Sequence, residues 1–326
     1  MAIAGSQHSR RWLLCSCWLL AWVFYTICSA LSDFFNSVFI SQYRFRFPGF
    51  IVLCQTLLTF STLQLLKQAR LLKIQPYLLE NGEIFLLPSI CFSFHSILIL
   101  WAGTSSNSTV FTFIRRFTPL ANLALTRTFN LKRRASSSSV LLVLLVILCS
   151  VLAGIHSFND EAVVYIYGLL NLVLESIYLT MLQKICEDQK RSVGDAYYTC
   201  TINSFPLLLV YCLLHPETYQ IYPSGSWTSL IFLGFFSLVL LLGCVLRFLT
   251  CLCTLLSSAL MMSMMEGAKI NVLTIRNIMA YEWIVSPTHL TTLLISVSGV
   301  GIFIYKNCEE TNISKRDNGN PTLKSI

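Results

Sequence analysis

The stretch Ser257–Ile275, SSALMMSMMEGAKINVLTI, decides the fold class, because it is long and apolar enough to cross a bilayer yet contains Glu266 and Lys269. An ionisable side chain inside a membrane helix normally faces a protein interior or a watery cavity, since contact with lipid is costly. Glu266 and Lys269 are three residues apart and share one helix face. Either they form an ion pair that holds helices together, or Lys269 holds an anionic substrate that Glu266 helps to position.

The composition of the whole chain indicates a membrane protein. Of its 326 residues, 55% are hydrophobic and 12% are charged, which is too apolar and too poor in charge for an ordinary soluble domain. We predict an all-α polytopic membrane protein with ten transmembrane helices in one domain over residues 1–306, followed by a polar tail over 307–326 that we expect to be disordered and cytosolic. The expected spans are 12–40, 48–66, 84–104, 108–129, 138–156, 161–184, 195–214, 225–245, 250–275 and 282–305.

The lysines and arginines gather at one end of these expected spans. The positive-inside rule therefore places both termini in the cytosol. Arg247 is counted among the cytosolic cations, in the connection between the eighth and ninth spans, whereas Arg115, Arg116 and Lys269 fall inside spans. The net charge of +8 follows from this topology and requires no nucleic-acid partner.

The fourth expected span contains two adjacent arginines in its middle. In FTFIRRFTPL, Arg115 and Arg116 precede Pro119, which removes one backbone hydrogen bond and predicts a kink. Two arginines at mid-helix either reach the interface or pair with Asp33 or Glu175, or at least one of them binds phosphate, which the guanidinium group suits.

The sixth and seventh expected spans add further polar groups. Asn171 and Glu175 share one face of the sixth span, a stripe that packing alone does not readily explain. Tyr197 and Tyr198 open the seventh span. Their rings either stack on a nucleotide base or form part of an interfacial aromatic belt.

The number of spans suggests an internal symmetry. Halves of five spans, about 12–156 and 161–305, have opposite orientations and predict two inverted five-helix repeats with a binding site near mid-membrane. The intramembrane cations can be neutralised internally, but six charged groups cannot all face lipid, so we expect a central polar cavity. These groups are Arg115, Arg116, Lys269, Asp33, Glu175 and Glu266.

The sequence contains none of the usual motifs of enzyme or metal chemistry. It has no glycine-rich phosphate loop, no HExxH and no serine nucleophile motif. Its 13 cysteines lie almost entirely within the spans, where cysteine acts as a small hydrophobic residue. We therefore expect no catalytic residue, no metal, no cofactor and no structural disulfide, and we predict that the protein is not an enzyme.

Five local patterns resemble the nucleotide-sugar transporter family of the drug/metabolite transporter superfamily, in particular its UDP-sugar branch. The likeness covers about residues 36–305. It rests on an asparagine before a Tyr-Arg-Phe-Pro-like turn, paired arginines, a spaced Asn and Tyr, a tyrosine-rich motif ending in proline, and Ser-Ala-Leu followed by a lysine. The matching stretches are NSVFISQYRFRFPG, FTFIRRFTPL, LNLVLESIYLTMLQK, AYYTCTINSFP and SSALMMSMMEGAK.

This resemblance implies a ten-helix antiporter that exchanges a cytosolic nucleotide sugar for a luminal nucleoside monophosphate, in the Golgi membrane or alternatively the endoplasmic reticulum membrane. Its partners would be these nucleotides and the lipid bilayer, and a homodimer is left open. The resemblance places Tyr197 and Tyr198 at the nucleotide and Lys269 at the phosphate. We expect Arg115 or Arg116 to join Lys269 there, and Glu266, Glu175 and Asn171 to line the sugar end.

The sequence departs from the family patterns at several positions. Thr199 and Cys200 stand where an asparagine usually follows the second tyrosine, Glu266 replaces a glycine, and Ile270 replaces an asparagine. The chain thus resembles a divergent member, and the pattern typical of GDP-mannose carriers is absent. Two other interpretations remain open: a non-transporting protein of the same fold that acts as a trafficking or scaffold partner, and a membrane-embedded transferase.

Overall fold

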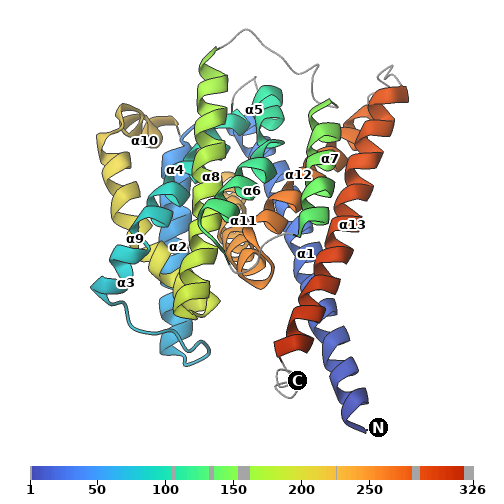
Figure 1. The fold of residues 1–326 in the computed structure, drawn as a ribbon. Helices are drawn as coiled ribbons and strands as arrows, with labels where there is room; N and C mark the ends of the chain where they lie inside the picture. The colour runs from blue at the N-terminus through green and yellow to red at the C-terminus, as the bar shows by residue number, and fades with distance from the viewer. Residues whose placement is uncertain are drawn as a thin grey trace.

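The computed structural model describes residues 2–104, 108–131, 136–152, 162–224, 226–280 and 287–318. These residues form helices and contain no β-strand. The helices stand side by side in a bundle, and both termini lie at the same end of it, which we call the termini end (Figure 1). The opposite end, where α10 lies, is the far end. The protein is therefore an all-α polytopic membrane protein, as the composition predicts.

The principal helices follow the expected spans in order. They are α1 (Ala2–Tyr43), α2 (Pro48–Gln68), α4 (Leu86–Thr104), α5 (Ser108–Arg115), α6 (Thr118–Thr128), α7 (Ser137–Leu152), α8 (Ala162–Gln189), α9 (Val193–Leu214), α11 (Leu230–Leu256), α12 (Ala259–Ala280) and α13 (Pro287–Asn318). Short helices α3 (Leu79–Ile84), η2 (Pro216–Gln220) and α10 (Ile221–Ser224) connect them.

Five segments in the described part of the chain are long and apolar enough to cross a membrane. Three shorter apolar helices accompany them, over Leu86–Ala102, Ser138–Leu152 and Leu290–Lys306. The five long segments are Leu20–Ile40, Pro48–Gln68, Ala162–Gln189, Val193–Leu214 and Leu230–Leu256.

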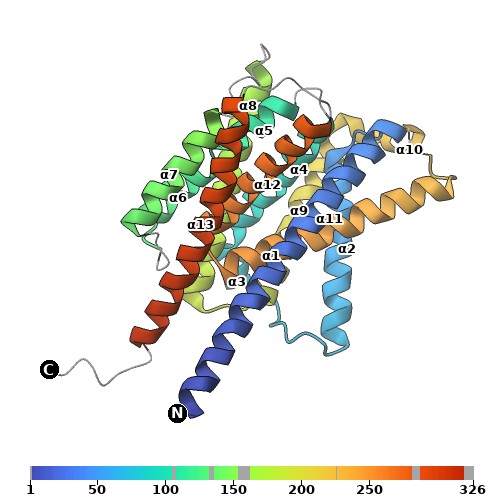
Figure 2. The same cartoon turned by 90° about the vertical axis from the view of Figure 1, so that its right-hand side faces the viewer.

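Four pairs of helices dominate the packing: α1 with α11, α4 with α8, α2 with α9, and α7 with α13. The pair α7 and α13 stands at one side of the bundle in Figure 1, and Figure 2 shows the long helix α1 crossing α11. Gly243 allows α11 to approach α2 closely, because a Cβ there would lie 2.0 Å from Gln55 Nε2. The Gln55 amide instead donates to the carbonyl of Val239 at 3.2 Å.

The fourth span is broken rather than merely kinked. Helix α5 ends at Arg115 and α6 begins at Thr118, with Pro119 in its first turn. The amides of Arg116 and Phe117 donate to carbonyls three residues earlier, at 3.1 and 3.0 Å, which tightens the chain at the break. A kink is predicted from Pro119; the structure instead interrupts the helix just before this proline, and the two arginines lie at the interruption itself.

The boundary predicted between the eighth and ninth spans is wrong. Helix α11 continues to Leu256, and the chain breaks at Ser257 and Ser258 instead of near 245–250. Ser258 Oγ accepts from the amide of Met261 at 3.1 Å, and Gln183 Oε1 accepts from the amide of Ala259 at 2.8 Å. These side chains satisfy the free amides at the start of α12.

The expected disordered tail is also shorter than predicted. Helix α13 continues from Pro287 through Asn318, so residues 307–318 are helical. The rest of the tail, 319–326, lies outside the described residues.

Candidate functional site

A cavity of about 120 Å³ lies inside the bundle between α1, α2, α4, α8, α11 and α12. Of the six charged residues expected around a central cavity, Asp33, Glu175 and Glu266 line it, whereas Arg115, Arg116 and Lys269 are not part of its lining. Its lining combines aromatic and aliphatic side chains with ionisable groups from five helices. These groups include Asp33 from α1, His95 from α4, Glu175 from α8, Arg247 from α11 and Glu266 from α12.

Arg115 connects two of the cavity's carboxylates. Its guanidinium donates to Glu266, and its Nε lies 3.8 Å from Glu175 Oε2. Glu266 also accepts a hydrogen bond from the hydroxyl of Tyr25. The break after α5 lets Arg115 reach these partners from a helix end. One guanidinium therefore serves two carboxylates from different helices.

Lys269 pairs with α1 and not with its neighbour on α12. Its Nζ lies 3.0 Å from Asp33 Oδ2 and 2.5 Å from Ser29 Oγ. The side chain of Lys269 is 9% exposed, whereas that of Asp33 is 52% exposed. The direct ion pair between Glu266 and Lys269, one of the two interpretations from sequence, is absent from the ion pairs of the described residues. Each instead binds a residue of another helix.

Several buried polar atoms around the cavity lack a hydrogen-bond partner among the described residues. They are Asn171 Nδ2 and the two atoms Glu175 Oε2 and Arg115 Nε, which lie 3.8 Å apart in an ion pair without forming a hydrogen bond. The other end of the Asn171 amide, Oδ1, lies 2.9 Å from His95 Nδ1. Because buried polar groups are nearly always hydrogen-bonded, these atoms indicate a place for a ligand or water with both donors and acceptors.

Arg116 lies outside this network, although it is adjacent to Arg115. It is 5% exposed, and its Nη1 donates to the carbonyl of Ser150 at 2.5 Å and to Asn271 Oδ1 at 2.8 Å. Its Nη2 lies 3.2 Å from Thr274 Oγ1. Neutral oxygens of α7 and α12 thus surround Arg116, and the structure does not bring it together with the other candidate residues.

Tyr197 and Tyr198 also lie outside the lining of the cavity. The hydroxyl of Tyr197 donates to the carbonyl of Cys244 on α11 at 3.2 Å. The hydroxyl of Tyr198 accepts from Gln64 Nε2 on α2 at 3.1 Å, and Lys67 Nζ lies 5.0 Å from the centre of its ring. In this conformation both rings fill the packing of α9 against its neighbours.

Arg247 is a cavity residue that the sequence interpretation misses. Its expected place is a connection between spans, but α11 is continuous there and Arg247 lines the cavity. Its Nη1 donates to Thr56 Oγ1 at 3.0 Å, and its guanidinium lies 5.2 Å from the centre of the Phe92 ring. The signal that could have revealed it is the apolar run from Leu230 to Leu256, which has no helix breaker before Ser257.

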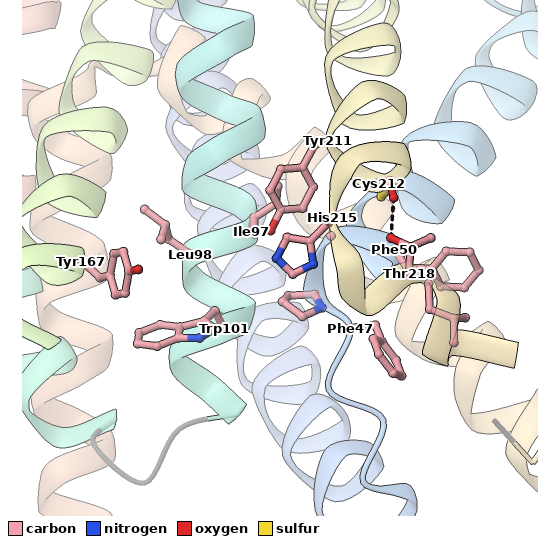
Figure 3. Close-up of a pocket in the computed structure, with 13 residues that line it drawn as sticks. Phe47, Phe50, Ile97, Leu98, Trp101, Tyr167, Tyr211, Cys212, His215 and Thr218 are labelled. Carbon is pink, nitrogen blue, oxygen red and sulfur yellow. Dashed lines mark hydrogen bonds between the residues drawn. The ribbon is translucent and has the colours of Figure 1, made fainter. Parts of the chain in front are cut away.

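A larger pocket of about 220 Å³ lies near the far end, between α2, α4, α8, α9 and the segment after α9 (Figure 3). Trp101 of α4, Tyr167 of α8, Tyr211 of α9 and His215, which directly follows α9, point into this region. Its lining includes no aspartate, glutamate, lysine or arginine. The smaller central cavity therefore fits a charged ligand better.

Sequence comparisons find transporters of nucleotide sugars. UDP-sugar transporter sqv-7 of Caenorhabditis elegans is 27% identical over 242 residues, which cover 73% of each chain. Nucleotide sugar transporter SLC35D2 of Homo sapiens is 26% identical over 292 residues, which cover 86% of this chain and 83% of that protein. No family model matches the sequence.

Comparison with solved structures supports the fold. One crystal structure superposes with a TM-score of 0.56 and covers 86% of this chain and 97% of its own, at 14% sequence identity. This likeness concerns the fold alone. The two curated relatives, both of which are named as transporters, agree with the resemblance noted from the sequence motifs: the chain is similar to nucleotide-sugar transporters.

Proposed function

We propose that the protein is a membrane antiporter that carries a nucleotide sugar in one direction and the matching nucleoside monophosphate in the other. The observation that carries this proposal is the central cavity, in which unpartnered donors and acceptors lie beside charged residues in the interior of a membrane bundle. Such groups are retained inside membranes mainly where they serve a substrate pathway. The names of the two relatives favour a UDP-sugar.

A ten-span arrangement of two inverted repeats suits alternating access, and the packing supports it. If α1, α2, α4, α5 with α6, and α7 form one half, their counterparts are α8, α9, α11, α12 and α13. The contact of α1 with α11 then corresponds to that of α8 with α4, and the contact of α2 with α11 to that of α9 with α4. The contacts α2 with α9 and α7 with α13 join equivalent helices. This pairing is the pattern expected of a two-fold relation between halves.

In the proposed substrate complex, the phosphates lie beside Arg115 and Lys269, and the sugar lies beside Glu175 and Asn171. Carboxylate and amide oxygens suit sugar hydroxyl groups, whereas the cations suit phosphate. Glu266 positions Arg115 beside the cavity. Of the two adjacent arginines, we assign the phosphate contact to Arg115, because Arg116 is enclosed by neutral oxygens of α7 and α12.

The nucleotide base is assigned to Tyr197 and Tyr198 in a second conformation. Both rings are buried against α2 and α11, so α9 must separate from these helices before a base can stack on either ring. Alternating access supplies such a movement. Because Tyr197 and Tyr198 lie near the start of α9, the nucleotide sugar would enter from the side of the membrane where α9 begins.

We further propose that both termini and the tail 307–326 lie in the cytosol, and that the protein resides in the Golgi membrane or, as the second choice, the endoplasmic reticulum membrane. The distribution of lysine and arginine supports this orientation. It places the far end of the bundle in the lumen.

A counterflow experiment tests the function. Proteoliposomes containing the purified protein are loaded with UMP, GMP or buffer, and entry of a panel of radiolabelled nucleotide sugars is measured. We expect UMP-dependent entry of at least one UDP-sugar, recovered intact from the vesicles. If folded protein admits none of the panel, the transport proposal fails, and a scaffold role becomes the better account.

A further inference from the structure

The cations around the cavity differ in whether a carboxylate neutralises them. Arg115 is bound to Glu266 and lies near Glu175, and Lys269 is bound to Asp33. Arg247 has no carboxylate within ion-pair distance among the described residues, and the protein atom that accepts from it is the hydroxyl of Thr56. A guanidinium group has five N–H donors, so most of its hydrogen-bonding capacity is unused.

We propose that Arg247 is a phosphate-binding residue of the central cavity and that it fixes the direction in which the ligand lies there. This inference rests on the proposed function. Arg247 lines the cavity directly and is about 13 Å from the end of α11 at Leu256, at 1.5 Å per helical residue. A cation so far inside a membrane helix, without an acidic partner, is costly unless an anion joins it.

The remaining charges strengthen this assignment. Among the described residues that line the cavity there are three carboxylates, Asp33, Glu175 and Glu266, and Arg247 is the one lysine or arginine. An anionic phosphate group that lies beside Arg115 and Lys269 is therefore also attracted toward Arg247 on α11. Glu175 Oε2 lies 3.8 Å from Arg115 Nε and has no hydrogen-bond partner among the described residues, so the hydroxyl groups of the sugar can donate to it. The phosphate end points toward α11 and the sugar toward α8.

A purely structural role for Arg247 is the competing explanation. The side chain joins α11 to Thr56 of α2 and to Phe92 of α4, so its loss could loosen the packing of these helices. Thr56→Val separates the two explanations, because it removes the hydrogen bond to Arg247 but keeps the arginine's charge. Arg127→Met removes an exposed arginine of α6 and serves as the matched control.

The experiment measures binding of UMP, uridine and inorganic pyrophosphate to purified wild type, Arg247→Met, Arg247→Lys, Thr56→Val and Arg127→Met by ligand-induced thermal stabilisation. We expect Arg247→Met to weaken UMP and pyrophosphate binding by about tenfold or more, as for loss of one hydrogen bond between charged groups. Uridine binding should change little, Arg247→Lys should restore part of the loss, and Thr56→Val and Arg127→Met should bind as wild type does.

Each outcome decides a separate point. Equal binding of UMP and pyrophosphate by Arg247→Met and wild type overturns the role of Arg247 while the proposed function stands. An equal loss in Thr56→Val overturns it too, in favour of a structural contact. If wild type binds pyrophosphate through Arg247 but no nucleotide, the inference survives and the nucleotide-sugar function fails. If wild type binds none of the three probes, both are overturned.

Discussion

Arg115 and Arg116 are adjacent in the chain, but their surroundings differ. The partners of Arg115 are charged, whereas those of Arg116 are neutral. Arg115 is shared by the carboxylates Glu175 and Glu266 beside the cavity. Arg116 is surrounded by a backbone carbonyl, an amide oxygen and a hydroxyl group, in a cluster of α7 and α12. The partners of Arg115 lie on α8 and α12, and those of Arg116 lie on α7 and α12.

This difference distinguishes a residue that can bind a ligand from a residue that only stabilises the packing of helices. Charges that pair with other charges across a cavity can exchange those partners for an ionic ligand. A charged side chain that is enclosed by neutral oxygens holds helices in place, and it has no charged partner that an ionic ligand could replace. We therefore expect variants of Arg115 to affect both stability and binding, and variants of Arg116 to affect stability alone.

The largest effect on folding is expected for Arg115→Met. This change leaves two buried carboxylates without their cation, and breaking a buried ion pair in this way costs about 3–5 kcal/mol. Thermal unfolding in detergent measures the loss, with Arg127→Met as the control. Adding Glu266→Gln to Arg115→Met removes one of the two stranded charges and should recover part of the stability. If Arg115→Met alone is as stable as wild type, Arg115 does not stabilise this group of charges.

A smaller loss of stability is expected for Arg116→Met. It removes a charged donor from buried oxygens of Ser150 and Asn271, which costs about 1–3 kcal/mol. Because the cluster lies apart from the cavity lining, UMP should stabilise the variant as much as it stabilises wild type. Loss of the UMP response without loss of stability would reverse the assignment and make Arg116 the phosphate-binding arginine.

Much of the fold and part of the candidate site are predictable from the sequence. Apolar runs indicate the membrane helices, and the rarity of charges within these runs singles out Glu175, Glu266 and Lys269. Pro119 indicates where the fourth span is interrupted. These signals are local: each depends on a residue type and its immediate sequence neighbours.

The pairing of charges is predicted only in part: the pair of Arg115 with Glu175 is one of the alternatives that the sequence offers, and the structure confirms it. Glu266 and Lys269 are neighbours on one helix face, but their partners, Arg115 and Asp33, come from helices distant in sequence. The tertiary packing of the helices decides which oppositely charged residue lies beside Glu266 and which lies beside Lys269. The orientation of Tyr197 and Tyr198 depends on helix rotation for the same reason.

The position of Arg247 inside the membrane bundle is not predicted from the sequence for a different physical reason. A single arginine late in an apolar run resembles the end of a span, so the positive-inside rule assigns it to the cytosol. Helix α11 ends before Ser257 and Ser258, and Ser258 Oγ and Gln183 Oε1 accept from the amides at the start of α12. Capping signals are thus a better guide to this boundary than charge.

The smallest effect on stability, and the largest on transport, is expected for Lys269→Ala. Its partner Asp33 is half-exposed and can be solvated, so the cost to folding should remain within about 1 kcal/mol. Lys73→Ala, which removes an exposed lysine between α2 and α3, is the matched control, and Lys269→Arg keeps the charge.

The measurement that tests the central claim most directly is UMP-driven counterflow of a UDP-sugar by wild type, Lys269→Ala and Lys73→Ala, reconstituted at equal amounts of folded protein. The cavity site predicts that uptake is abolished in Lys269→Ala and unchanged in Lys73→Ala. Uptake by Lys269→Ala at the wild-type rate would contradict the account, because the substrate would then cross the bundle without the cation placed beside its phosphates.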